Sequence, residues 1–102
     1  MSADHVIRER GGTVTVTAVA ISGLVGRAAE TVPGAHLRRP KRGLHVELAA
    51  NRACVTLELA ADRGRVLPEL GRAVQDAVAE ALRRSCGIVA DSVEVTIHEL
   101  RS

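Results

Sequence analysis

The sequence contains no phenylalanine, tyrosine or tryptophan among its 102 residues. A folded core therefore has to be built from Val, Leu, Ile and Ala, without the large buried areas that aromatic rings contribute. A chain of this length has room for one hydrophobic core and one domain. We therefore expect a single domain with a thin core of modest stability.

Cysteine is almost as scarce, and the residue types that bind metals show no chelating pattern. Cys54 and Cys86 match neither a CxxC nor a zinc spacing, and two thiols are too few for a disulfide scaffold. The four histidines are scattered along the chain, at His5, His36, His45 and His98. The sequence predicts free cysteines in a reducing cytoplasm, with no metal and no other cofactor.

Long apolar runs are absent as well. No stretch approaches the roughly 20 apolar residues that are needed to cross a bilayer, and residues 1–5 are polar rather than leader-like. We expect a cytoplasmic protein. Any association with the inner face of the cell membrane is then expected to come through a surface or a partner.

Neither charge is in large excess, because 14 basic residues face 12 acidic ones and the formal net charge is +2. This balance is unlike that of a general polyanion binder. Positive charge is concentrated only in Arg38, Arg39, Lys41 and Arg42, around Pro40. Such a run is typical of a solvated loop, but it is also a candidate contact for a phosphate, a lipid headgroup or an acidic protein surface.

Hydrophobic periodicity predicts the element order βαββαβ. Period-two alternation indicates strands over 13–17, 44–48, 55–59 and 93–98. Helical spacing indicates one helix that Thr17 caps and Pro33-Gly34 ends, and another over 66–84. Each strand has one apolar face, so the predicted fold is α+β: a four-stranded sheet with both helices packed on one face. Residues 1–10 are expected to be a polar tail, and residues 11–100 a single domain.

Two local features carry further expectations. The segment from Ala35 to Gly43 is predicted to be a loop, and Asn51 is expected to take a left-handed backbone in the turn before 55–59. Gly71 lies inside the second helix and costs about 1 kcal/mol relative to Ala. This indicates that another backbone approaches the helix closely there.

Polar residues alternate onto the sheet face that points away from the helices. The predicted set is His45, Glu47, Cys54, Thr56, Glu58, Glu94, Thr96 and His98. On an open face, water keeps carboxylates near their solution pKa values, which is unfavourable for acid–base catalysis. The spacing Gly23 to Gly26 formally fits a GxxG loop of RNA-binding domains, but the helical period continues through it, which favours helix packing. The sequence predicts no catalytic residue, no metal ligand and no small-molecule substrate.

Self-association through the sheet is the expected mode of action. The candidate surfaces are unpaired strand edges and a threonine-rich face formed by Thr13, Thr15, Thr56 and Thr96. The alternative is a small RNA- or DNA-binding domain that uses the basic run at 38–42. A salt titration separates the two, because phosphate contacts give a steep salt dependence.

Several segments occur in an order that is similar to one bacterial family. They are Gly12-Thr13-Val14-Thr15-Val16, Val32-Pro33-Gly34-Ala35, Gly43-Leu44-His45-Val46-Glu47, Arg63-Gly64-Arg65-Val66-Leu67-Pro68-Glu69-Leu70 and Asp91-Ser92-Val93-Glu94-Val95-Thr96-Ile97-His98. Over residues 11–100 the chain resembles the alkaline-shock, or general-stress, envelope protein family. The resemblance implies a non-enzymatic scaffold or adaptor of the envelope stress response, a homo-oligomer that an integral membrane partner recruits. The chain departs from the family at Val66, where a polar cap is common, and at Ala60-Ala61-Asp62, which lacks an aromatic residue.

Overall fold

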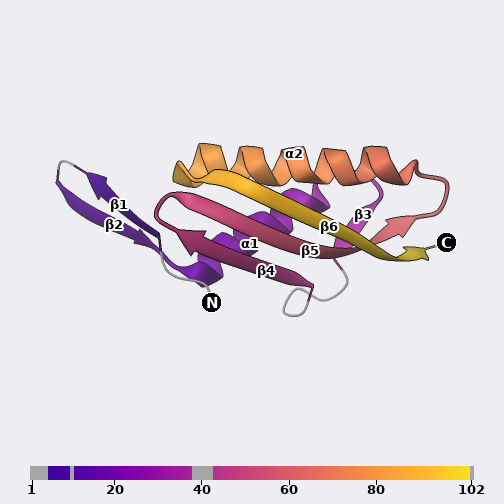
Figure 1. Cartoon of the computed structure of the whole chain (residues 1–102), viewed down its shortest axis with the longest axis horizontal. Coiled ribbons are helices and arrows are strands. Elements are labelled where there is room, and N and C mark those ends of the chain that lie inside the picture. Colours follow the sequence, from indigo (N-terminus) through magenta and orange to yellow (C-terminus); the bar gives the residue numbers. More distant parts are fainter. Residues whose placement is uncertain (1–4, 10, 38–42, 102) are drawn as a thin grey trace.

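The computed structural model describes residues 5–9, 11–37 and 43–101. These residues form six strands and two helices (Figure 1). In chain order the elements are β1 (His5–Glu9), β2 (Gly12–Val16), α1 (Ala18–Glu30), β3 (Ala35–Leu37), β4 (Leu44–Ala49), β5 (Arg52–Asp62), α2 (Leu67–Cys86) and β6 (Val89–Arg101). The molecule is elongated, 50 × 21 × 18 Å, because the β1–β2 hairpin projects from the end of the main body.

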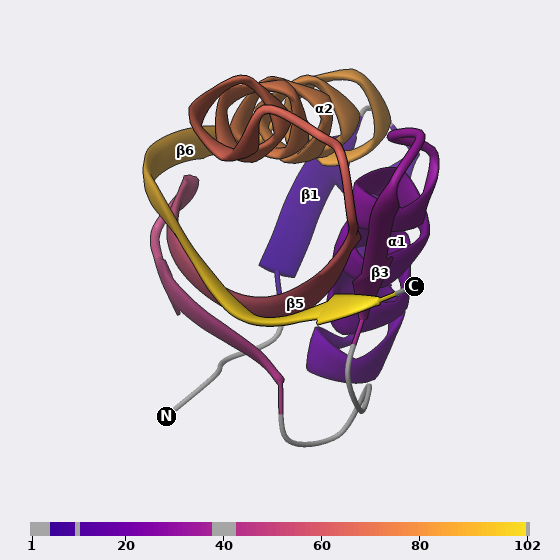
Figure 2. The same ribbon diagram turned by 90° about the vertical axis from the view of Figure 1, so that its right-hand side faces the viewer.

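β5 is the central strand of the main sheet. β4 and β3 pair antiparallel with successive stretches of one side of β5, and β6 pairs parallel with the other side. The curved sheet wraps around both helices, which lie on its concave face (Figure 2). The predicted α+β class, with two helices on one face of a four-stranded sheet, is confirmed.

The membership of that sheet differs from the prediction in its first strand. β2 pairs with β1 in a separate two-stranded sheet, with Val6 opposite Thr15, and contributes nothing to the main sheet. The reason is local: β1 immediately precedes β2 in the chain, and the two strands pair with each other. The fourth strand is instead β3, which lies in the segment from Ala35 to Gly43 that was expected to be a loop. Residues 5–9, expected within a polar tail, form β1.

The core lies between the concave face of the sheet and the two helices, and it contains only aliphatic residues, alanine and one cysteine. The largest side chains that are fully buried come from α1, β5, α2 and the turn before β6: Ile21, Val25, Val55, Leu57, Leu59, Val74, Val78, Leu82 and Ile88. Burial of each contributes about 1.5–3 kcal/mol relative to exposure. An aromatic-free core therefore depends on many small contributions rather than on one anchor.

The ends of the helices follow from local sequence. Thr17 is the N-cap of α1, and its Oγ1 accepts a hydrogen bond from the backbone N–H of Ala20 at 3.1 Å. α2 ends at Gly87, whose φ of 66° is left-handed and costs glycine little. In the turn between β4 and β5, the left-handed residue is Ala50 (φ 57°) and not Asn51. Pairing of Ala49 with Arg52 places Ala50 at the first central turn position, where type II′ hairpins require a positive φ.

Candidate association surfaces

The outer face of the sheet, which points away from both helices, is polar, as the alternation predicts. The strand register sets its residues in rows across β4, β5 and β6. Thr56 lies between His45 and Glu94, Cys54 lies between Glu47 and Ser92, and Glu58 lies beside Thr96. His98 joins this face and its Nε2 lies 3.3 Å from Glu58 Oε1. Both side chains are about 40% exposed, at 43% and 39%, so water screens their interaction.

This face does not assemble a metal site. Within the described residues, no group of three or more His, Cys, Asp or Glu side chains is placed to hold a metal ion. A second histidine–carboxylate contact joins β3 to the end of β5, with His36 Nε2 3.0 Å from Asp62 Oδ1. Among the described residues, no third candidate ligand completes a metal site there either. The outer face is therefore a polar surface with scattered pairs of side chains.

The four candidate threonines do not form one surface. Thr56 and Thr96 are exposed on neighbouring strands of the outer face. Thr13 and Thr15 are exposed on β2, which has left the main sheet. The predicted threonine-rich face is thus divided between the sheet and the hairpin. The basic candidates Arg38, Arg39, Lys41 and Arg42 lie outside the described residues, and their role remains a prediction.

The GxxG spacing is part of a helix, as the periodicity favours. α1 runs through both glycines, and a Cβ at Gly26 would lie only 3.1 Å from a methyl group of Leu37 on β3 and 3.8 Å from one of Leu44 on β4. Gly26 therefore allows α1 to pack closely on the two strands. At Gly23 the nearest atom is the guanidinium of Arg27, in the same helix, at 3.3 Å.

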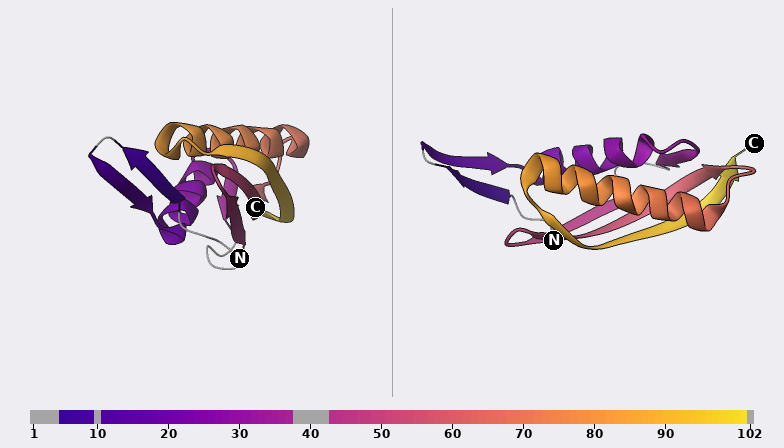
Figure 3. Two further views of the ribbon diagram at one scale, coloured as in Figure 1. Left: turned by 60° about the vertical axis from the view of Figure 1, so that its left-hand side comes forward. Right: turned by 90° about the horizontal axis from the view of Figure 1, so that it is seen from above.

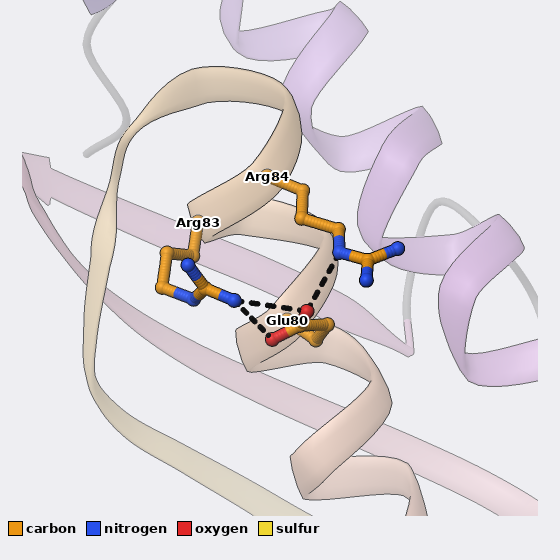
Figure 4. A network of polar contacts seen from close by, with 3 residues as sticks. All are labelled: Glu80, Arg83 and Arg84. Carbon is orange, nitrogen blue, oxygen red and sulfur yellow. Dashed lines mark hydrogen bonds and ion pairs between the residues drawn. The ribbon is translucent and has the colours of Figure 1, made fainter.

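A long seam between α2 and β6 forms a concave feature of the surface. Near the C-terminal end of α2 it is lined by Asp76, Ala79, Glu80, Arg83, Ile88, Val89 and Ala90. Here Arg83 donates from Nη2 to both carboxylate oxygens of Glu80, at 3.0 and 2.9 Å, and Arg84 Nε lies 2.7 Å from Oε1 (Figure 4). The hydrogen bond from Arg83 lowers the pKa of Glu80. In this half of the seam, Glu80 and Arg83 are already paired with each other.

The other half of the seam is more open. Gln75 divides the two halves, because its Nε2 donates to the backbone carbonyl oxygen of Val93 at 3.0 Å. Beyond it, toward the start of α2, Gly71 faces a groove of about 510 Å³. The expectation that another backbone approaches Gly71 is wrong for a single chain, since a Cβ there would meet nothing within 4 Å.

The projecting hairpin is a surface that the sequence analysis did not predict. We call β1 and β2, residues 5–9 and 12–16, the arm. Val6 in β1 is 49% exposed, and Val16, at the base of the arm, packs against the core. The left panel of Figure 3 shows the arm standing clear of the sheet and of both helices. The sequence does carry a signal for this hairpin, because the dipeptide Gly11-Gly12, where β2 begins, is typical of hairpin turns.

None of the described helices is long and apolar enough to span a bilayer. The two cysteines are free thiols, one exposed and one buried. Burial raises the pKa of the Cys86 thiol, which keeps it protonated and unreactive near neutral pH.

No family model matches this sequence, and no curated protein matches it either. Solved structures of MamM C-terminal domains do match its fold. The copper form is 23% identical, covering 83% of this chain and 87% of that one, with a TM-score of 0.62. The nickel form of the E289H variant is 19% identical over 82% of this chain and 99% of that one (TM-score 0.56), and the C267S variant is 18% identical over 82% and 96% (TM-score 0.57). At such identities the likeness shows a shared fold.

These comparisons correct the family expected from the sequence. The alkaline-shock resemblance is wrong, because the structural neighbours are MamM C-terminal domains. The predicted envelope stress function and its nucleic-acid-binding alternative are therefore wrong as well. The segments that carried the resemblance are turns, caps and strand alternations, which many chains of this topology share. The prediction that the chain is not an enzyme stays a prediction, because likeness at these identities shows the fold alone.

Proposed function

We propose that this chain is a non-catalytic association domain that pairs with a second copy of itself. The observation that supports the proposal is the arm. Two five-residue strands project from the end of the main body, and Val16 at their base packs against the core. An isolated two-stranded hairpin is marginally stable in water at best, so an ordered arm requires a surface to pack on. In a single chain the described residues offer it none.

A second copy is the partner that best fits the arm. Homo-oligomers with closed symmetry are the commonest soluble assemblies, and an arm that packs on a second copy is matched by the same contact in reverse. Each copy then buries the exposed part of the other's arm. This contact stabilises both arms and leaves the outer sheet face available for another protein.

The proposed setting is cytoplasmic, at the inner face of the cell membrane, with an integral membrane protein as the anchor. Support comes from the fold neighbours, since MamM C-terminal domains are attached to a membrane transporter. The domain would then report on, or hold together, the membrane protein to which it is bound. The basic run at 38–42 is proposed to add weak contacts to anionic headgroups, worth about 1 kcal/mol per basic residue and sensitive to salt.

Metal binding is left out of the proposal. MamM domains have been solved in copper and nickel forms, whereas the described residues here bring together no group of three candidate ligands. Purification without chelator, followed by elemental analysis, tests this. Stoichiometric bound metal would contradict the proposal and would point to His45, Cys54 and His98 on the outer face.

Light scattering coupled to size exclusion tests the pairing. The wild-type chain has a mass of 10.8 kDa, and we expect twice this mass at high micromolar concentration and the monomer mass on dilution. Thr15→Pro is expected to shift the protein toward monomer, because proline removes a strand N–H from the arm. Thr15→Val keeps the strand and should dimerise normally. A wild type that remains monomeric at every concentration would refute self-association.

A further inference from the structure

An open groove lies between the first half of α2 and the second half of β6. Its lining residues are Leu67, Pro68, Gly71, Arg72, Gln75, Val95 and Ile97, and its volume is about 510 Å³. Beside it runs the outer edge of β6, which within the described part of the chain pairs with β5 alone. The right panel of Figure 3 shows α2 running along the length of the sheet above this edge. A strand that paired with the edge would lie in the groove.

The edge of β6 is regular over residues 92–97, between two irregularities in its pairing with β5 at Asp91 and His98. The strand contains neither Pro nor Lys, and it is 13 residues long. The hydrogen bond from Gln75 occupies the backbone carbonyl of Val93. Because the backbone groups of a strand point alternately to its two sides, those of Val95 and Ile97 share the outward side with Val93. The open part of the edge therefore lies in the groove.

Gly71 gives the groove its depth on the side of α2. A Cβ at this position would meet no atom within 4 Å, so nothing in a single chain fills the space beside it. An added strand would bring a second backbone close to α2 at this point. Glycine is the residue type that leaves room for such an approach.

We infer that the arm of a second copy adds as a strand to the edge of β6 in this groove, and that two such contacts close a symmetric dimer. The inference rests on the proposed function and names the surface that it uses. Strand addition supplies backbone hydrogen bonds along the edge, and the groove receives alternate side chains of the arm.

Length and charge support the arm as the occupant. Each arm strand has five residues, which span about 17 Å and fit within the regular stretch of β6 at residues 92–97. In the sequence, Arg8 and Arg10 outnumber Glu9 in the arm and its turn, whereas β6 carries three acidic residues and one arginine. Opposite net charges favour and orient the encounter. Two such contacts approach the roughly 20 residues per partner of a stable interface.

Gly71→Leu tests the groove without disturbing the fold. Leucine is a better helix former than glycine, and its Cβ has free space in the monomer, so we expect the Tm of the monomer to stay equal or rise. The side chain fills the groove, and the dimer dissociation constant should increase at least tenfold. Ser85→Leu adds the same side chain to an exposed position about 21 Å further along α2 and should leave dimerisation unchanged.

Mixing two variants distinguishes this contact from other modes of pairing. Thr15→Pro disrupts the arm and leaves the groove intact, whereas Gly71→Leu fills the groove and leaves the arm intact. Only a mixed dimer of the two variants can therefore place an intact arm in an intact groove. We expect the mixture to dimerise more tightly than either variant alone. If Thr15→Pro weakens the dimer while Gly71→Leu does not, the arm docks elsewhere and this inference is refuted while the proposed function stands. If the wild type does not dimerise, both are refuted.

Discussion

Gln75 on α2 donates a hydrogen bond from its Nε2 to the backbone carbonyl oxygen of Val93 on β6, at 3.0 Å. This contact satisfies a carbonyl on the strand that has no second neighbour in the described sheet. It also divides the seam between α2 and β6 into a half lined by paired charges and an open half. One glutamine thus determines where a further strand finds free backbone groups.

Removal of this hydrogen bond should destabilise the chain modestly. We expect Gln75→Ala to lower the free energy of unfolding by about 0.5–1.5 kcal/mol, the net contribution of a typical hydrogen bond. Gln75→Glu keeps the shape of the side chain, but an ionised carboxylate cannot donate to a carbonyl, so it should lose at least as much. Urea denaturation of the three proteins measures the differences. Wild-type stability in Gln75→Glu would show that the bond contributes nothing.

The central core position is Leu57, which is fully buried on β5 between Leu44 of β4 and Val95 of β6. Leu57→Ala should cost about 2–5 kcal/mol, because the cavity cannot be refilled by large aromatic neighbours. Leu100, at 45% exposed, provides the matched control. Leu100→Ala should change stability by no more than about 0.5 kcal/mol in the monomer. Similar losses in both variants would contradict the core assignment.

Local periodicity was sufficient for both helices and for the central strands. Thr17 and Pro33 delimit α1 from the chain itself, and the alternation around Val46 and Val55 gives the β4–β5 hairpin. These signals are local, since a cap or a pleat involves residues a few positions apart. The α+β class follows from them because all the apolar stripes require one shared core.

Pairing between distant strands could not be predicted in the same way. β2 pairs with β1 rather than with an edge of the main sheet, and alternation within β2 does not distinguish between these partners. β3 is only three residues long, too short for an alternation pattern to be recognised. The empty space beside Gly71 likewise has no local signature, because a glycine in a helix looks the same whether a neighbour approaches or not.

The start of β5 is tied to the start of β6 by an ion pair whose strength depends on pH. Arg52 donates from Nε to both carboxylate oxygens of Asp91, at 2.7 and 2.9 Å, and this hydrogen bonding lowers the pKa of Asp91 below its ordinary value of 3.8. A lowered folded-state pKa stabilises the fold above the unfolded pKa, and the stabilisation is lost as pH falls through the folded value.

Asp91→Asn should therefore lower the Tm near neutral pH by a few degrees at most, since the pair is exposed and screened by water. The difference from wild type should shrink below about pH 4 and disappear near pH 2. High salt should reduce it as well. A difference that persisted in acid would mean that the asparagine acts through something other than the charge of Asp91.

Cys54 and Cys86 provide a test of which face the dimer uses. Cys54 is exposed on the outer face of the sheet, and Cys86 is buried at the end of α2, where burial raises its pKa. In native protein one thiol should therefore react with a thiol reagent, and in denaturant both should.

If the arm docks between α2 and β6, the outer face stays open in the dimer. Cys54 should then be alkylated at the same rate in dilute monomer and in concentrated dimer, with Cys54→Ser as the control that identifies the reacting thiol. Protection of Cys54 at high concentration would instead place the interface on the outer face, where Thr56 and Thr96 lie.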